Sequence, residues 1–93
     1  MNLKILTNSF TSAQENMQFD QQLVEDNHTL TNILSRIYIW KTPSITQAYN
    51  KSIPSDLTHI NHSTRITGGG LVFHTPGDIL ITTLLPIKPQ PKT

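Results

Sequence analysis

Three consecutive glycines, Gly68, Gly69 and Gly70, lie between Arg65 and an apolar segment that begins at Leu71. Glycine has no Cβ atom, so it takes a positive φ readily and lets another group approach the backbone closely. The successive N–H groups of such a turn can point at one anion. An arginine beside the turn can hold a phosphate or carboxylate through two parallel hydrogen bonds. The segment therefore predicts either a tight turn without a ligand or an anion-binding turn, and its spacing fits neither a P-loop nor a dinucleotide fingerprint.

The chain on both sides of the glycines has the composition of strands and turns. β-branched and aromatic residues are typical of strands, and they predict strands over residues 3–6, 36–41, 45–49, 71–74 and 79–85. Residues 79–85 are almost entirely apolar or β-branched, which predicts a strand covered on both faces. Residues 75–78 predict a turn by their composition, and residues 54–57 predict a short helical turn.

One helix is expected near the N-terminus. Ser12 and Glu15 form a capping-box pattern, and a helical stripe of apolar residues follows to about Asp26. The residues expected on the inner face of this helix are Ala13, Met17, Leu23 and Val24. The order of elements predicts an α+β fold, in which a partial mixed or antiparallel sheet carries the helix on one face.

Composition excludes several classes of protein and site. The chain has 93 residues, which allows one small domain or a piece of one, and it has no cysteine to form disulfides or thiolate metal sites. The net charge of +1 gives no strong attraction to nucleic acid or to a membrane surface. The start lacks the apolar core of a signal peptide, and no apolar stretch approaches bilayer length. We expect a soluble, cytoplasmic protein with no metal site, in which His59 and His62 face solvent and Trp40 lies in the core.

Residues 65–74, Arg-Ile-Thr-Gly-Gly-Gly-Leu-Val-Phe-His, resemble the R-x-[ST]-G-G-G-x-V-x-H block of the lipoate–protein ligase A family, within the biotin/lipoate ligase (BPL/LPL catalytic domain) superfamily. Residues 15–20 are similar to the E-N-x-x-x-[DE] helix of that family, and residues 39–46 are similar to its strand–Trp–x–x–Pro–strand segment. The resemblance covers residues 3–87. It implies a partial catalytic domain over residues 1–87, resembling the N-terminal half of a class II biotin/lipoyl ligase domain, followed by a proline-rich disordered tail at 88–93.

The resemblance implies a two-step ligase reaction. Lipoate attacks ATP, with Mg²⁺, to form lipoyl-adenylate, and the acyl group then passes to a lysine of a carrier. The implied carriers are the lipoyl domains of 2-oxoacid dehydrogenases or the glycine cleavage H protein. The resemblance implies that the lipoyl-adenylate pocket is lined by Arg65, Thr67, Gly68, Gly69, Gly70, Val72, Phe73 and His74. We expect the apolar slot for the acyl chain to be formed by Leu71, Phe73 and the neighbouring strands.

The chain departs from the family pattern in two places. The downstream block that carries the family's lysine is absent, and Ala48 stands where the family usually has a glycine. We therefore expect a truncated domain that is inactive alone, or one completed by a second chain that supplies the missing half. The alternatives are an octanoyl or lipoyl transferase, a relative of biotin ligases, and a non-catalytic acyl-binding fragment. No nucleic-acid or membrane partner is expected.

Overall fold

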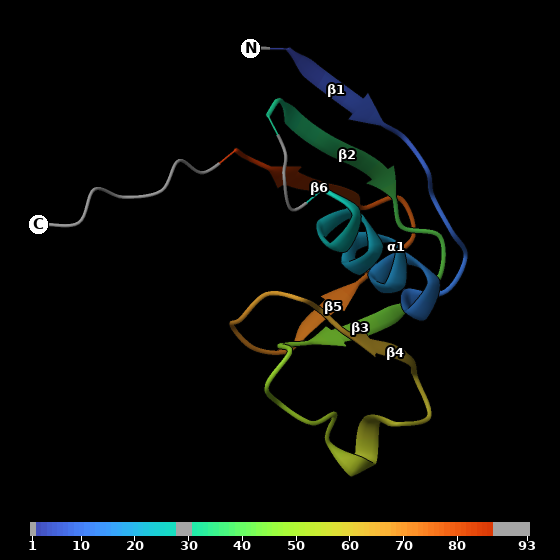
Figure 1. Cartoon of the computed structure of the whole chain (residues 1–93). Coiled ribbons are helices and arrows are strands. Elements are labelled where there is room, and N and C mark those ends of the chain that lie inside the picture. Colours follow the sequence, from blue (N-terminus) through green and yellow to red (C-terminus); the bar gives the residue numbers. More distant parts are fainter. Residues whose placement is uncertain (1, 28–30, 87–93) are drawn as a thin grey trace, which may run out of the picture.

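The computed structural model describes residues 2–27 and 31–86, and in this part of the chain one α-helix lies between two three-stranded sheets (Figure 1). The helix is α1 (Ala13–Asp26), and a short 3-10 helix, η1, spans Ser55–Leu57. The first sheet has the order β1-β2-β6, formed by Leu3–Leu6, Ile33–Ile39 and Ile79–Leu84. The second has the order β4-β3-β5, formed by Asn61–Thr64, Ser44–Gln47 and Val72–His74.

Both sheets are mixed, with one parallel and one antiparallel pair each. β2 runs parallel to β1 and antiparallel to β6, while β3 runs parallel to β4 and antiparallel to β5. The predicted α+β class with a mixed sheet and a packed helix is confirmed, but the expectation of one sheet is wrong. Thr42 and Pro43 separate β2 from β3, and proline cannot donate to a ladder, so the chain leaves the first sheet there. β4 was not predicted from its polar sequence, and residues 88–93 lie outside the described part.

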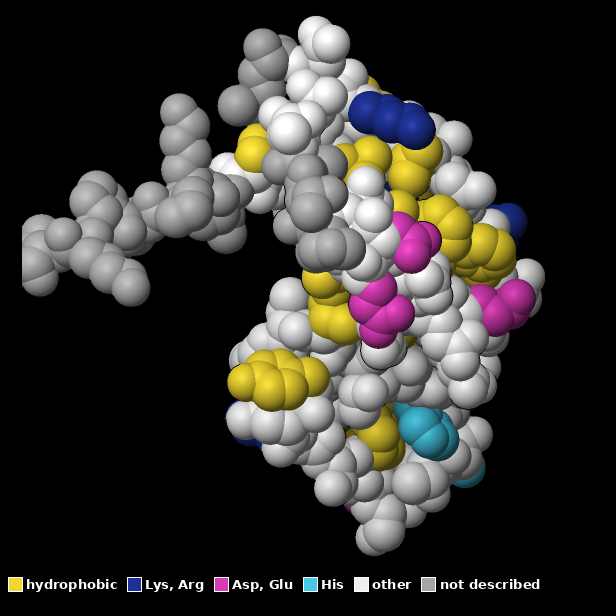
Figure 2. Space-filling view, viewed as in Figure 1, with side chains coloured by type: hydrophobic (Ala, Val, Ile, Leu, Met, Phe, Trp, Pro, Cys, Tyr) yellow, Lys and Arg dark blue, Asp and Glu magenta, His cyan; other side chains and the backbone are white. Residues whose placement is uncertain are grey.

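The start of α1 is capped from two directions. The Ser12 hydroxyl accepts from the Glu15 N–H at 3.1 Å, which confirms Ser12 as the N-cap; the Glu15 carboxylate accepts from the Ser12 hydroxyl at 2.9 Å in place of the Ser12 N–H expected for a capping box. The side-chain oxygen of Asn61 accepts from the Ala13 N–H at 2.8 Å, so β4 also satisfies a donor of the helix end. Caps of this kind contribute about 1 kcal/mol each. The outer face of α1 is polar, and acidic side chains gather over it (Figure 2).

The apolar core lies where α1 meets both sheets. It consists of Ala13, Met17, Tyr38 and Trp40, with Leu80 packed against them. Trp40 is fully buried, which confirms its expected place in the core. Val24 was expected on the inner face of the helix, and this prediction is wrong, because 43% of Val24 is exposed. The last turn of α1 lies beside a hollow lined by Leu23 and Asp26, so the sheet does not cover it.

One face of the first sheet is apolar and exposed. Residues on β6 alternate between exposed and half-buried, and Ile79 and Ile81 are 68% and 66% exposed. The prediction of a strand covered on both faces is therefore wrong, because no described element packs on the outer face. Ile81 lies opposite Ile37, and Ile79 lies opposite Ile39, so the apolar side chains form a continuous surface. The exposed apolar residues of the three strands are Leu3, Ile5, Ile37, Ile39, Ile79 and Ile81.

Replacing Ile79 and Ile81 with threonine is expected to reduce self-association of the chain. Threonine keeps the preference for strands while removing apolar surface from an uncovered face. Light scattering coupled to size exclusion should show a mass closer to the monomer for the double variant than for the wild type. Tyr49→Thr, which removes an equally exposed side chain outside this face, should leave the mass unchanged. A wild-type protein that is already monomeric at high concentration would contradict this prediction.

Candidate anion-binding site at the glycine loop

The loop that leads into β5, residues 65–70 and called here the glycine loop, turns its carbonyl groups toward two cationic side chains. Arg65 Nη2 donates to the carbonyl of Gly68 at 3.2 Å and to that of Gly70 at 2.7 Å. Lys51 Nζ donates to the carbonyl of Gly69 at 2.8 Å. All three glycine carbonyls are therefore bound by cations, and the negative ends of these peptide dipoles are neutralised.

Arg65 holds the loop against the second sheet. Its Nη1 donates to the backbone carbonyl of Thr46 at 2.9 Å and to the Thr46 hydroxyl at 2.8 Å. Both terminal nitrogens of the guanidinium group are therefore occupied by protein acceptors. The two-bond clamp on a ligand that the sequence suggested is absent from this arrangement, because those nitrogens shape the loop instead. The remaining contribution of Arg65 to a ligand is its positive charge and its Nε–H.

The N–H groups of Gly68, Gly69 and Gly70 lack acceptors within the described chain, whereas the Arg65 N–H at the start of the loop donates to the Gln47 carbonyl at 2.8 Å. No backbone hydrogen bond is donated by Gly68, Gly69 or Gly70 to another described residue. Successive unpaired N–H groups in a turn, beside a cation, form a concavity that suits a carboxylate or a phosphate. The three glycines therefore have N–H donors without described partners, and the anion-binding turn stays a prediction.

The three glycines differ in what the fold requires of them. Gly69 has a φ of +104°, which favours glycine, and a Cβ there would lie 3.5 Å from Arg65 Nη2. Gly68 and Gly70 have no positive φ, and a Cβ at either position would meet no atom within 4 Å. The fold itself therefore needs glycine only at position 69. The bare backbone at Gly68 and Gly70 suits a group that approaches from outside the described chain.

Next to the glycine loop, a cavity of about 310 Å³ opens between the two sheets and α1. Of the predicted site residues, the structure brings Arg65, Thr67 and His74 together in its wall. Val72 and Phe73 are 42% and 64% exposed and lie outside the wall, so the apolar slot expected from Phe73 is not formed. Apolar and polar side chains from both sheets and α1 line the cavity together: Met17, Asp20, Tyr38, Thr46, Arg65, Ile66, Thr67, His74, Leu80, Ile81, Thr82 and Thr83.

His74 lies in this wall as a neutral group. Its ring stacks on Trp40, with centroids 4.2 Å apart and planes at 18°, and its Nε2 lies 2.8 Å from the Thr46 hydroxyl. Burial lowers the pKa of His74 below its usual value, and the Asp78 carboxylate opposes this shift while the Arg65 guanidinium adds to it. The imidazole is therefore uncharged near neutral pH and acts through hydrogen bonds.

The floor of the cavity is a buried charged network that the sequence did not reveal. Arg36 is fully buried; its Nη1 donates to the Asp20 carboxylate at 2.8 Å and its Nη2 to the Asn16 side chain at 2.6 Å. The other Asp20 oxygen accepts from Thr82 at 3.0 Å and from Tyr38 at 3.4 Å. Burial and then the Asp20 charge raise the pKa of Tyr38 to about 12, so its hydroxyl stays protonated. The sequence signal for this network was the helix motif of residues 15–20, which contains both Asn16 and Asp20.

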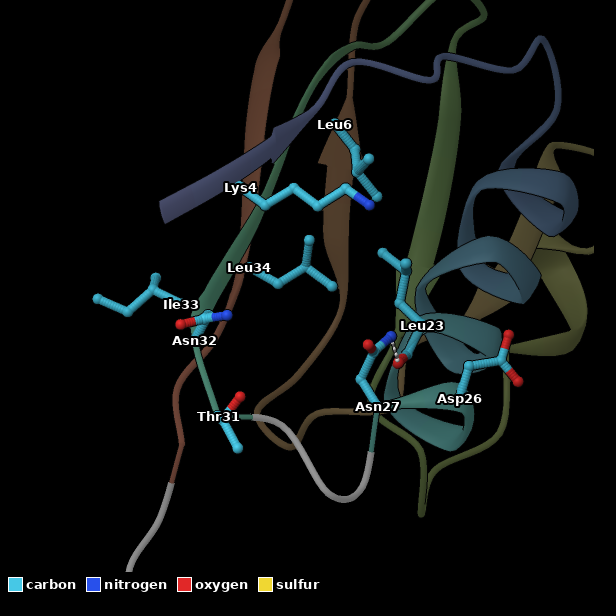
Figure 3. Close-up of a pocket in the computed structure, with 9 residues that line it drawn as sticks. All are labelled: Lys4, Leu6, Leu23, Asp26, Asn27, Thr31, Asn32, Ile33 and Leu34. Carbon is cyan, nitrogen blue, oxygen red and sulfur yellow. Dashed lines mark hydrogen bonds between the residues drawn. The ribbon is translucent and has the colours of Figure 1, made fainter. Parts of the chain in front are cut away.

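A second hollow, of about 370 Å³, lies between the end of α1 and the first sheet (Figure 3). No predicted site residue lines it. Its wall is formed by Lys4, Leu6, Leu23, Asp26, Asn27, Thr31, Asn32, Ile33 and Leu34. The Asn27 amide, at the end of the helix, donates to the Leu23 carbonyl at 2.8 Å and so is used within α1. The cavity beside the glycine loop has Arg65, Thr67 and His74 of the predicted site in its wall. The other predicted site residues do not line it: Gly68, Gly69, Gly70, Val72 and Phe73.

Other classes of site receive no support from the described residues. His59 and His62 are exposed, as expected, and nowhere in residues 2–27 and 31–86 do three or more histidine or carboxylate side chains cluster as metal ligands. The described part also contains no helix with the length and apolar character needed to span a bilayer. No family model, curated protein or solved structure matches the chain. The glycine loop, its sequence motif and the cavity beside it are therefore the features that bear on function.

Proposed function

We propose that the chain binds an acyl-adenylate at the glycine loop and forms part of a lipoate–protein ligase-like site. In this proposal the loop N–H groups bind the phosphate or acyl carboxyl oxygens, and the apolar chain enters the cavity. The observation that carries the proposal is that the N–H groups of the three glycines are unpaired among the described residues, while the carbonyl groups of the same glycines accept from Arg65 and Lys51. Donors oriented in advance toward developing negative charge are the groups that stabilise adenylate formation.

The cavity supports both parts of such a ligand. Arg65 and the glycine loop provide a positive end, while Met17, Ile66 and Leu80 provide apolar contacts for an acyl chain. These three residues take the role that the sequence motif suggested for Leu71 and Phe73. The motif resemblance names lipoate as the acid, ATP with Mg²⁺ as the source of the adenylate, and a lipoyl carrier domain as the acceptor.

The proposal is one of binding and not of turnover by this chain alone. The described wall of the cavity contains one cationic side chain, Arg65, and no lysine. Arg65 uses both terminal nitrogens to hold the loop, so it has no pair of free N–H groups for a two-bond contact with an adenylate. We expect no lipoyl transfer to a purified carrier domain in an intact-mass assay with ATP, Mg²⁺ and lipoate.

Calorimetric titration with a non-hydrolysable sulfamoyl analogue of lipoyl-adenylate tests the proposal. We expect saturable binding that Arg65→Ala weakens at least about tenfold, because the variant loses the positive charge at the cavity and the four hydrogen bonds that hold the glycine loop in shape. Lys41→Met, which removes an exposed cation outside the cavity, is the matched control and should bind as the wild type does. Absence of binding, or tighter binding of the biotinyl analogue, would reject the lipoyl assignment.

A further inference from the structure

Thr46 lies at the centre of a hydrogen-bonded chain that joins the glycine loop to His74. Thr46 is fully buried on β3, and its hydroxyl oxygen lies 2.8 Å from Arg65 Nη1 and 2.8 Å from His74 Nε2. A guanidinium group can only donate, so the Thr46 oxygen accepts from Arg65. The hydroxyl has one proton, and His74 Nε2 is the only other partner that it has among the described residues.

The single proton of the Thr46 hydroxyl decides which tautomer the His74 imidazole adopts. The Thr46 proton points to His74 Nε2, so Nε2 is the acceptor and Nδ1 bears the ring proton. The opposite tautomer would place an Nε2 proton against the Thr46 oxygen and leave a buried hydroxyl proton without an acceptor, which native structures avoid. Stacking on Trp40 fixes the plane of the ring.

The Nδ1 atom is available to a ligand. No described group accepts from His74 Nδ1, and no polar side-chain atom in the described part is both buried and unpaired. The Nδ1–H group therefore has accessible surface, and the residue itself lines the cavity. A neutral N–H donor in that position would bind an oxygen atom of a carboxyl or phosphoryl group.

We propose that Thr46 is a positioning residue that fixes His74 as the neutral Nδ1–H tautomer, with Nδ1–H as a donor to the ligand oxygen. The tautomer is a property of the free protein, whereas the donation to a ligand rests on the proposed function. The same hydroxyl accepts from Arg65, so Thr46 positions both the cationic Arg65 and the neutral His74 at the cavity. Nothing in the sequence motif points to this threonine.

Nitrogen NMR of the histidine rings tests the tautomer directly. In protein labelled with ¹⁵N-histidine, correlations between ring protons and nitrogens distinguish Nδ1–H from Nε2–H, and the His74→Gln spectrum assigns the signal. We expect the Nδ1–H pattern in the wild type and in Thr46→Ser, which keeps the hydroxyl. Thr46→Val should show the Nε2–H tautomer or a mixture. An Nε2–H pattern in the wild type would overturn the inference, and this result does not depend on how Thr46→Val folds.

Calorimetry with the same sulfamoyl analogue tests whether His74 donates to the ligand. We expect Thr46→Val to weaken binding about tenfold and Thr46→Ser to bind within about twofold of the wild type. Equal binding by all three proteins would overturn the role of His74 toward the ligand. A wild type that shows the Nδ1–H tautomer but does not bind the analogue would reject the proposed function and leave the positioning of His74 by Thr46 standing.

Discussion

Arg36→Met is expected to destabilise the fold by about 3–5 kcal/mol, because it leaves the Asp20 carboxylate buried without its cation. Arg36 is fully buried and makes four hydrogen-bonding contacts, to Asn8, Asp20 and both the carbonyl and the side chain of Asn16. Its guanidinium carbon also lies 3.6 Å from the centre of the Tyr38 ring. Methionine keeps part of the volume and removes all of these contacts. A domain of this size has about 5–10 kcal/mol of total stability, so the variant should be close to unfolding.

Denaturant unfolding followed by circular dichroism measures this effect. Lys41→Met, an exposed position at the end of the same strand, should change stability by no more than about 0.5 kcal/mol. Adding Asp20→Asn to Arg36→Met should recover part of the loss, since the uncompensated charge is then removed. If Arg36→Met costs less than about 1 kcal/mol, the buried network does not have the role that we assign to it.

The second large effect concerns the glycine loop. Gly68→Ala and Gly70→Ala together are expected to weaken binding of the lipoyl-adenylate analogue by about 100-fold or more. A Cβ at either position meets no protein atom within 4 Å, so it would project into the space that the ligand needs. Alanine keeps the backbone N–H, so the loss comes from the added methyl groups, which hold the ligand away from the loop. Weakening two hydrogen bonds to a charged group in this way costs about 3 kcal/mol, which corresponds to this change in Kd.

Gly69→Ala provides the contrast within the same loop. Its φ of +104° makes a side chain strained, so this variant should lose about 1–3 kcal/mol of stability. Gly68→Ala and Gly70→Ala should keep wild-type stability within about 0.5 kcal/mol, or gain slightly from a less flexible unfolded chain. Unchanged binding in stable Gly68→Ala and Gly70→Ala proteins would mean that these glycines do not contact the ligand.

Local patterns in the sequence predicted most of the elements but not how they combine. The N-cap at Ser12, the turn at Thr75 and the strands β2 and β6 follow from short-range rules, and all are present. Whether β6 is covered depends on which elements reach its outer face, and that is a long-range property. The same limit explains why β4 was missed, since its polar residues pair with β3 through tertiary context rather than through strand propensity.

In the candidate site, too, local sequence patterns predicted some residues and missed those whose roles depend on long-range packing. The motif identified Arg65, Thr67 and His74, and these three residues do meet at one cavity. It could not identify Lys51 or Thr46, because their roles depend on where β3 and the following loop lie in space. It also suggested Phe73 for the apolar wall, but of the three residues of β5 only His74 is buried, while Val72 and Phe73 are both exposed.

The most direct test of an anion site at the glycine loop is a ¹H–¹⁵N spectrum recorded during titration with the sulfamoyl analogue. The chain has four glycines, and Gly77 lies in the separate turn at residues 75–78, outside the glycine loop, so it is an internal control. We predict that the amide signals of Gly68, Gly69 and Gly70 move as their N–H groups bind the ligand, while that of Gly77 stays in place. Loop signals that do not move at saturating ligand, or that move no more than Gly77, would contradict the account.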